Sequence, residues 1–67
     1  MTLGTKIIEL RKKQNLTQEQ LSEKLGITRQ TLSNWEKGIT NPDIEQAKNI
    51  ALLFKISLDD LTDNKLE

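Results

Sequence analysis

The sequence predicts an all-α protein, a compact bundle of five short helices. Apolar residues recur at spacings of three and four along most of the chain, and no stretch shows the alternating pattern of a half-buried strand. Each periodic segment is bounded by a capping residue, by one of the three glycines or by the single proline. The 67 residues suffice for one domain. We expect this domain over residues 1–62 and a short frayed tail over residues 63–67.

The first two predicted helices are separated by a polar turn. The first spans about residues 3–14, and its apolar face comprises Leu3, Ile7, Ile8 and Leu10. Thr17 opens the second helix as part of a capping box, in which Gln20 reaches back to the Thr17 backbone. Leu21 and Leu25 line one face of this helix. Gly26 then suits the left-handed conformation that commonly ends a helix.

The third predicted helix has Thr28 as its N-cap and ends at Gly38. Leu32 and Trp35 form its apolar pair, so we expect Trp35 to pack in the core. A turn at Asn41-Pro42 follows.

Two more helices complete the predicted bundle. Asp43 to Gln46 offers a second capping box at the start of the fourth helix. Its inward face is predicted to hold Ile44, Ala47, Ile50, Ala51 and Phe54. Ser57 begins a last short helix that carries Leu58 and Leu61.

The composition excludes several classes of protein. The chain has neither Cys nor His, which excludes ordinary zinc sites and most pairs of a nucleophile and a base. We therefore expect that the protein is not an enzyme and that it binds no metal, no other cofactor and no small-molecule ligand. The longest apolar run, residues 50–54, is far shorter than the roughly 20 residues of a membrane span. The opening residues lack a signal-peptide core, so we expect a cytoplasmic protein.

The charge is unevenly distributed although its sum is zero. Residues 1–41 contain seven cations and four anions, a net charge of +3. Residues 42–67 contain three cations and six anions, a net charge of −3. This pattern predicts a mildly basic surface for phosphate in the N-terminal part, with the acidic part facing elsewhere.

Residues 18–37 carry the functional signal, because two short helices joined at Gly26 fit a helix-turn-helix. The second helix has an outer face rich in side chains that can hydrogen-bond to base edges. Arg29 suits guanine, whereas Gln30 and Asn34 suit adenine. Gln30 and Asn34 are also neighbours one helical turn apart. The segment therefore predicts recognition of double-stranded DNA in the major groove.

The segment TQEQLSEKLGITRQTLSNWEKG at residues 17–38 resembles the helix-turn-helix of the phage-repressor/Cro family, also called xenobiotic-response-element-like. The resemblance extends over nearly the whole chain, from Leu10 to Leu61, and implies a lambda-repressor-like fold. Two positions depart from the family pattern. Ser22 stands where Ala is usual, and its hydroxyl can bond the carbonyl one turn back. Ile39 stands where a basic residue is frequent, which lowers the expected number of phosphate contacts.

The resemblance also implies roles for individual residues. Base reading is expected of Arg29, Gln30, Asn34 and Gln18, of which Gln18 would also touch phosphate. Contacts to the DNA backbone are expected of Thr17, Thr28, Thr31, Ser33, Lys37 and Thr40. Arg11 and Glu36 correspond to a family pair that forms a partly buried ion pair, so we expect them to be structural.

We expect a bacterial or phage-encoded, nucleoid-associated transcriptional repressor that binds a palindromic operator. One such domain touches one half-site, so a homodimer is predicted, with half-sites about one helical turn apart. The candidate dimer interface comprises Ile56, Leu58, Leu61 and Leu66. The alternative is an antitoxin-like or other interaction module that binds a protein partner as well as DNA.

Overall fold

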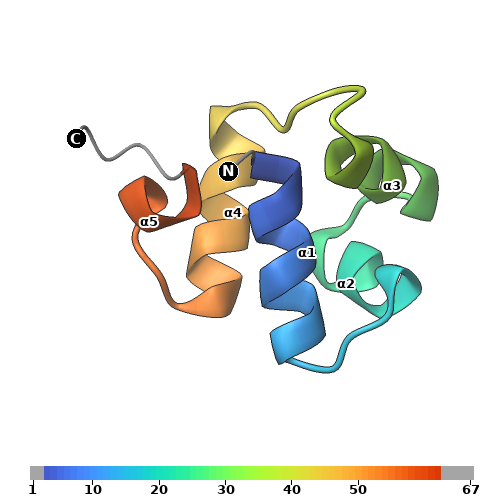
Figure 1. The fold of residues 1–67 in the computed structure, drawn as a ribbon, viewed down its shortest axis with the longest axis horizontal. Helices are drawn as coiled ribbons and strands as arrows, with labels where there is room; N and C mark the ends of the chain where they lie inside the picture. The colour runs from blue at the N-terminus through green and yellow to red at the C-terminus, as the bar shows by residue number, and fades with distance from the viewer. Residues whose placement is uncertain (1–2, 63–67) are drawn as a thin grey trace.

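The computed structural model describes residues 3–62, which contain helices and turns but no strand (Figure 1). Four helices have eight or more residues: α1 (Leu3–Lys13), α2 (Gln18–Leu25), α3 (Arg29–Lys37) and α4 (Ile44–Phe54). A shorter helix of five residues, α5 (Leu58–Thr62), follows α4. The predicted all-α class is confirmed, and the expected tail over residues 63–67 lies outside the described residues.

Helix α1 occupies the middle of the fold, with α2 and α3 on one side and α4 and α5 on the other (Figure 1). It packs against α3 and α5, while α4 packs against α5 and α2. The α2–α3 pair is therefore supported from behind by α1 and α4. Within residues 3–62, every helix is too short or too polar to cross a membrane.

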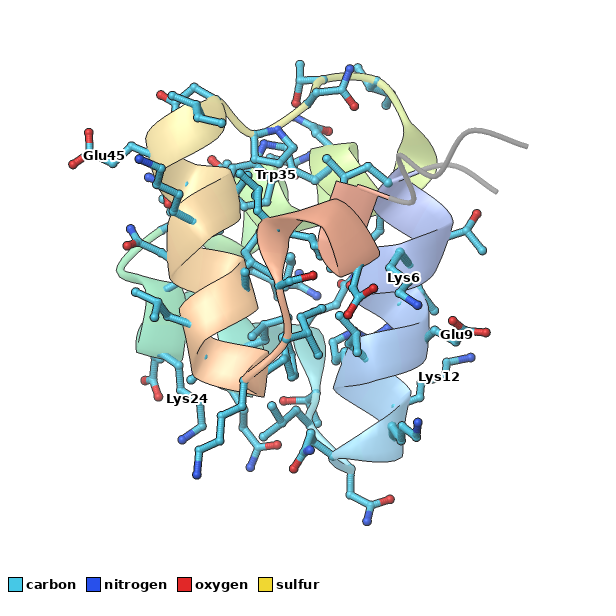
Figure 2. The ribbon with its side chains drawn as sticks, turned by 90° about the vertical axis from the view of Figure 1, so that its left-hand side faces the viewer. Lys6, Glu9, Lys12, Lys24, Trp35 and Glu45 are labelled. Atoms are coloured by element: carbon cyan, nitrogen blue, oxygen red, sulfur yellow. The ribbon has the colours of Figure 1, made fainter. Side chains whose placement is uncertain are left out.

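The core draws at least one residue from each of the five helices. Its buried apolar side chains are Ile7, Leu21, Leu32, Trp35, Ala47, Ile50, Ala51 and Leu61. Around them pack the half-buried residues Leu3, Leu10, Leu16, Leu25, Ile27, Phe54, Ile56 and Leu58. Trp35 is only 5% exposed, which confirms its expected place in the core. Figure 2 shows its ring behind α4 and α5, between the helices.

The helix ends follow the predicted local signals. The capping box of α2 is complete, because Thr17 Oγ1 accepts from Gln20 N–H at 3.0 Å and Gln20 Oε1 accepts from Thr17 N–H at 2.9 Å. Thr28 caps α3 by accepting from the Thr31 N–H group at 3.1 Å. Gly26 and Gly38 end α2 and α3 in the left-handed conformation, with φ of 72° and 79°.

The start of α4 differs from the prediction in two ways. Asp43 does cap the helix, with Gln46 N–H donating to Asp43 Oδ1 at 2.9 Å. The reciprocal half of the box is missing, since the Gln46 Oε1 atom is buried without a hydrogen-bond partner among residues 3–62. Ile44 was expected to face inward, but it is 64% exposed. It occupies the first position of α4, and the buried face of this helix begins one turn later at Ala47.

Gly4 marks a close approach between α1 and the last turn of α3. A Cβ atom on Gly4 would collide with the Trp35 carbonyl oxygen and lie 2.8 Å from the Glu36 carbonyl oxygen. Both obstacles are backbone atoms, which cannot swing aside as a flexible side chain can. Glycine at this position therefore allows α1 to support α3 directly.

Candidate nucleic-acid interface

Helices α2 and α3 form a tightly joined pair. Leu21 of α2 and Leu32 of α3 are both fully buried. The turn between the helices is closed by Gly26 and by a hydrogen bond from Ile27 N–H to the Ser22 carbonyl at 3.0 Å. This arrangement fixes α3 relative to α2 and leaves the outer side of α3 uncovered.

Ser22, which stands where Ala is usual in the family pattern, is buried. Its side chain is 4% exposed, and Oγ donates to the Glu19 carbonyl oxygen at 2.9 Å. The hydroxyl is thereby satisfied within its own helix, which avoids the cost of burying an unpaired polar group. The expectation for this departure from the family pattern is confirmed.

The outer side of α3 presents polar and basic side chains. Arg29, Gln30 and Lys37 are exposed, whereas Thr31, Ser33 and Asn34 are partly exposed. Glu36 is the single acidic residue of α3, and its side chain is only 5% exposed. The outer face of α3 therefore carries no accessible carboxylate of its own.

Glu36 is held away from this face by Arg11 of α1. Arg11 Nε lies 2.8 Å from Glu36 Oε2, and Arg11 Nη2 donates to Glu36 Oε1 at 3.3 Å. Arg11 also donates from Nη1 to the Leu16 carbonyl oxygen at 3.0 Å. The expected ion pair is present, and the Arg11 side chain is 14% exposed. The contact between the Arg11 guanidinium and the Glu36 carboxylate is bidentate, which adds both strength and geometric specificity.

Gln18 belongs to the same network. Its Nε2 atom donates to Glu36 Oε1 at 2.9 Å, so α2 is joined to α3 through this contact. The sequence predicted a base or phosphate contact for Gln18 and gave no sign of this bond. The bond holds the Gln18 amide against the last turn of α3, and Gln18 also lines one open hollow together with Arg29. Gln18 is therefore positioned by the protein at the edge of the α3 outer face.

Several residues expected at the DNA backbone already use their polar atoms within the protein. The hydroxyls of Thr17 and Thr28 cap α2 and α3. Thr28 Oγ1 also lies 2.9 Å from Thr31 Oγ1, at hydrogen-bonding distance. Lys37 and Thr40 are exposed near the end of α3, where their side chains can reach solvent.

The two amides predicted to read adenine are bonded to each other. Gln30 Nε2 donates to Asn34 Oδ1 at 3.1 Å. These residues are one helical turn apart, the spacing at which side chains on a helix meet. The structure therefore brings together a pair that the sequence had placed on one edge.

The residues expected at a dimer interface fall into three groups. Leu61 is fully buried in the core of the single chain, so it has no surface to offer a partner and its assignment was wrong. Ile56 and Leu58 are half-buried and line a small apolar hollow with Leu52. Leu66 lies outside the described residues.

Leu52 is the surface residue that the sequence reading missed. It is 75% exposed, more than any other large apolar side chain of residues 3–62. A signal existed, because Leu52 lies off the apolar stripe of α4, next to Ala51. An exposed apolar side chain outside the core stripe is a candidate contact for a partner.

Comparison with known proteins agrees with this geometry. A helix-turn-helix family profile matches residues 7–61. The chain belongs to the Cro/C1-type helix-turn-helix family. The matched range lies inside the domain expected over residues 1–62.

Relatives with curated names are transcriptional regulators of this family. Over 61 residues the chain is 41% identical to the HTH-type transcriptional activator BcrR of Enterococcus faecalis, which covers 91% of this chain and 30% of BcrR. It is 40% identical over 59 residues to an uncharacterized HTH-type transcriptional regulator of Archaeoglobus fulgidus, covering 88% of this chain and 83% of that protein. The HTH-type transcriptional regulator ImmR of Bacillus subtilis is 36% identical over 59 residues, with 88% and 46% covered. The chain thus spans less than a third of BcrR and most of the archaeal protein.

Solved structures share the whole fold. A transcriptional regulator from Listeria innocua superposes with a TM-score of 0.91 at 29% identity, covering 98% of this chain and 62% of that one. The N-terminal DNA-binding domain of SinR from Bacillus subtilis gives a TM-score of 0.83 at 29% identity, covering 97% and 96%. Helix-turn-helix regulator domains are therefore the structural neighbours of this chain.

Proposed function

We propose that this protein is a transcriptional regulator that binds specific sequences of double-stranded DNA by placing α3 in the major groove. Arg29, Gln30 and Asn34 read base edges, with Gln18 beside them. Lys37 and Thr40 contact the sugar–phosphate backbone, together with the residues at the starts of α2 and α3. The protein acts where the chromosomal DNA lies, in the cytoplasm.

The observation that carries the proposal is the composition of the α3 outer face. Its accessible side chains are amides, hydroxyls and cations, and the one carboxylate of α3 is bound to Arg11. A carboxylate on this face would repel the DNA phosphates. Cations on this face instead neutralise phosphates and release the counterions bound to the DNA. The names of the relatives, several of them transcriptional regulators, support the same function.

We further propose that the protein represses transcription as a homodimer on a palindromic operator. A single α3 reaches one half-site, and a twofold dimer places two of them about one helical turn apart. The proposed interface centres on Leu52, Ile56 and Leu58, which line one apolar hollow. Burial of Leu52 there would remove the most exposed large apolar side chain of residues 3–62 from water.

A comparison of two lysine variants tests where the DNA interface lies. Lys37 ends α3, whereas Lys24 lies on α2 and lines a hollow with Leu52 and Leu53 of α4. Both lysines are exposed, and Figure 2 shows Lys24 pointing outward below α4. Fluorescence anisotropy at several salt concentrations is expected to show a salt slope reduced by about one for Lys37→Ala and unchanged for Lys24→Ala. Equal salt slopes for the two variants would contradict the proposed DNA interface.

A further inference from the structure

The hydrogen bond between Gln30 and Asn34 restricts what each amide can offer to DNA. Gln30 Nε2 donates one of its two hydrogens to Asn34 Oδ1, at 3.1 Å. Gln30 is exposed and Asn34 is partly exposed, so both amides remain within reach of a ligand. A bond of this kind fixes which end of each amide is the donor and which is the acceptor.

The remaining hydrogen-bonding groups of the two side chains differ. Gln30 retains one N–H and its whole Oε1 atom, which is the combination that pairs with adenine N7 and N6. Asn34 retains both hydrogens of Nδ2, while its Oδ1 already accepts from Gln30. Asn34 is therefore left mainly as a donor, and guanine is the base whose major-groove edge offers two acceptors, N7 and O6.

We propose that Gln30 and Asn34 act as one reading unit for two neighbouring base pairs, in which Gln30 binds adenine and Asn34, oriented by Gln30, binds guanine. The inference rests on the proposed function and specifies the bases that this face selects. Neighbouring bases on one strand are about 3.4 Å apart along the duplex axis. Gln30 and Asn34 are one helical turn apart and their amides lie side by side, with Nε2 and Oδ1 3.1 Å apart, so the two amides can face adjacent bases without separating.

If the two residues form one unit, a change at Gln30 alters the base preference of Asn34. When Gln30 is replaced by Ala, Asn34 Oδ1 loses its donor and the Asn34 amide can turn. A free Asn amide pairs with adenine through one acceptor and one donor. The preference for guanine at the Asn34 base pair should then fall, although Gln30 does not touch that base pair.

The experiment measures base preference at every position of the bound site. Operators are selected from a pool of random duplexes with the full-length protein. Binding of each variant to all single-base-pair changes of the selected operator is then measured by fluorescence anisotropy. Asn34→Ala identifies the base pair that Asn34 contacts, and Gln30→Ala tests whether its preference depends on Gln30. Glu9→Ala is the control, because Glu9 is exposed on α1 and is assigned no contact with DNA.

A second variant keeps the hydrogen bond between Gln30 and residue 34 and removes the donors with which Asn34 contacts its base. Asn34→Asp keeps an oxygen that accepts from Gln30 Nε2 but loses both donors. It should abolish the guanine preference and leave the adenine preference at the Gln30 base pair intact. The added charge repels phosphate on every duplex, and Asp can itself accept from cytosine N4 at the Asn34 base pair, so the informative ratio is the one at the Gln30 base pair.

The expected result is an adenine next to a guanine in each selected half-site, with a roughly tenfold loss of guanine preference in Gln30→Ala. If Gln30→Ala and Asn34→Ala each alter one base pair and leave the other unchanged, the two residues read independently and the inference is overturned. A wild-type protein that binds all duplexes equally would overturn the proposed function itself, and this inference with it.

Discussion

Glu36 of α3 and Arg11 of α1 are joined by two hydrogen bonds, the shorter of which is 2.8 Å. The contact has two effects at once. It fastens the reading helix to the central helix of the fold, and it turns the carboxylate of α3 away from the face that would meet phosphate. Gln18 of α2 donates a hydrogen bond to the same carboxylate, so Glu36 of α3 is in contact with both α1 and α2.

The Glu36→Ala variant should lose about 3 kcal/mol of unfolding free energy, because it leaves the Arg11 guanidinium partly buried without its counterion. Chemical denaturation measures this loss. Glu9→Ala is the control, since Glu9 lies exposed on the outer side of α1 with Lys6 and Lys12 nearby (Figure 2). That change should stay within about 0.5 kcal/mol.

The double variant Arg11→Ala with Glu36→Ala should cost less than the sum of the two single changes, since it removes both charges together. A loss below about 0.5 kcal/mol in Glu36→Ala alone would show that the ion pair contributes nothing to the fold.

The Gly4→Ala variant should destabilise the protein by roughly 1–3 kcal/mol, because the added methyl group meets the backbone carbonyls of Trp35 and Glu36. The sign of the effect is decisive. In an unobstructed helix the same change stabilises by about 0.5–1 kcal/mol. Thermal or urea unfolding that shows a gain in stability would mean that α1 and α3 do not approach so closely.

The Leu52→Glu variant should remain folded and become monomeric, because burying a carboxylate at the centre of the proposed apolar interface costs more than the exposed Lys48, which lines the same hollow, can offset. Sedimentation equilibrium at several protein concentrations measures the shift. Ile44→Glu is the matched control, since Ile44 is 64% exposed and lies at the other end of α4. A wild-type protein that binds a palindromic duplex strictly one-to-one would contradict the dimer.

The sequence predicted those features that neighbouring residues determine. Thr17 with Gln20 and the glycines Gly26 and Gly38 end their helices as expected, because capping bonds and left-handed conformations depend on a few adjacent positions. The polar outer face of α3 followed from helical periodicity in the same way. The Arg11–Glu36 pair came from the family resemblance alone, since its members are 25 residues apart.

Features that depend on packing between distant segments were missed. Ile44 fits the apolar period of α4, yet it lies in the first turn, ahead of the buried part of the helix. Leu61 reads equally well as an interface residue or a core residue, and the packing of α5 against α1 and α4 decides for the core. Nothing in the sequence marks Gly4, because its role arises from the carbonyl oxygens of α3 that lie against it.

The central claim is that the α3 face selects a specific DNA sequence, and competition binding tests it most directly. The operator selected from random duplexes is titrated with wild-type protein beside a scrambled duplex of the same composition, at two salt concentrations. We predict binding to the operator at least about 10³-fold tighter than to the scrambled duplex, with a tenfold or greater loss of affinity for the operator in Gln30→Ala. Equal and steeply salt-dependent affinity for both duplexes would show attraction to phosphate alone and contradict the claim.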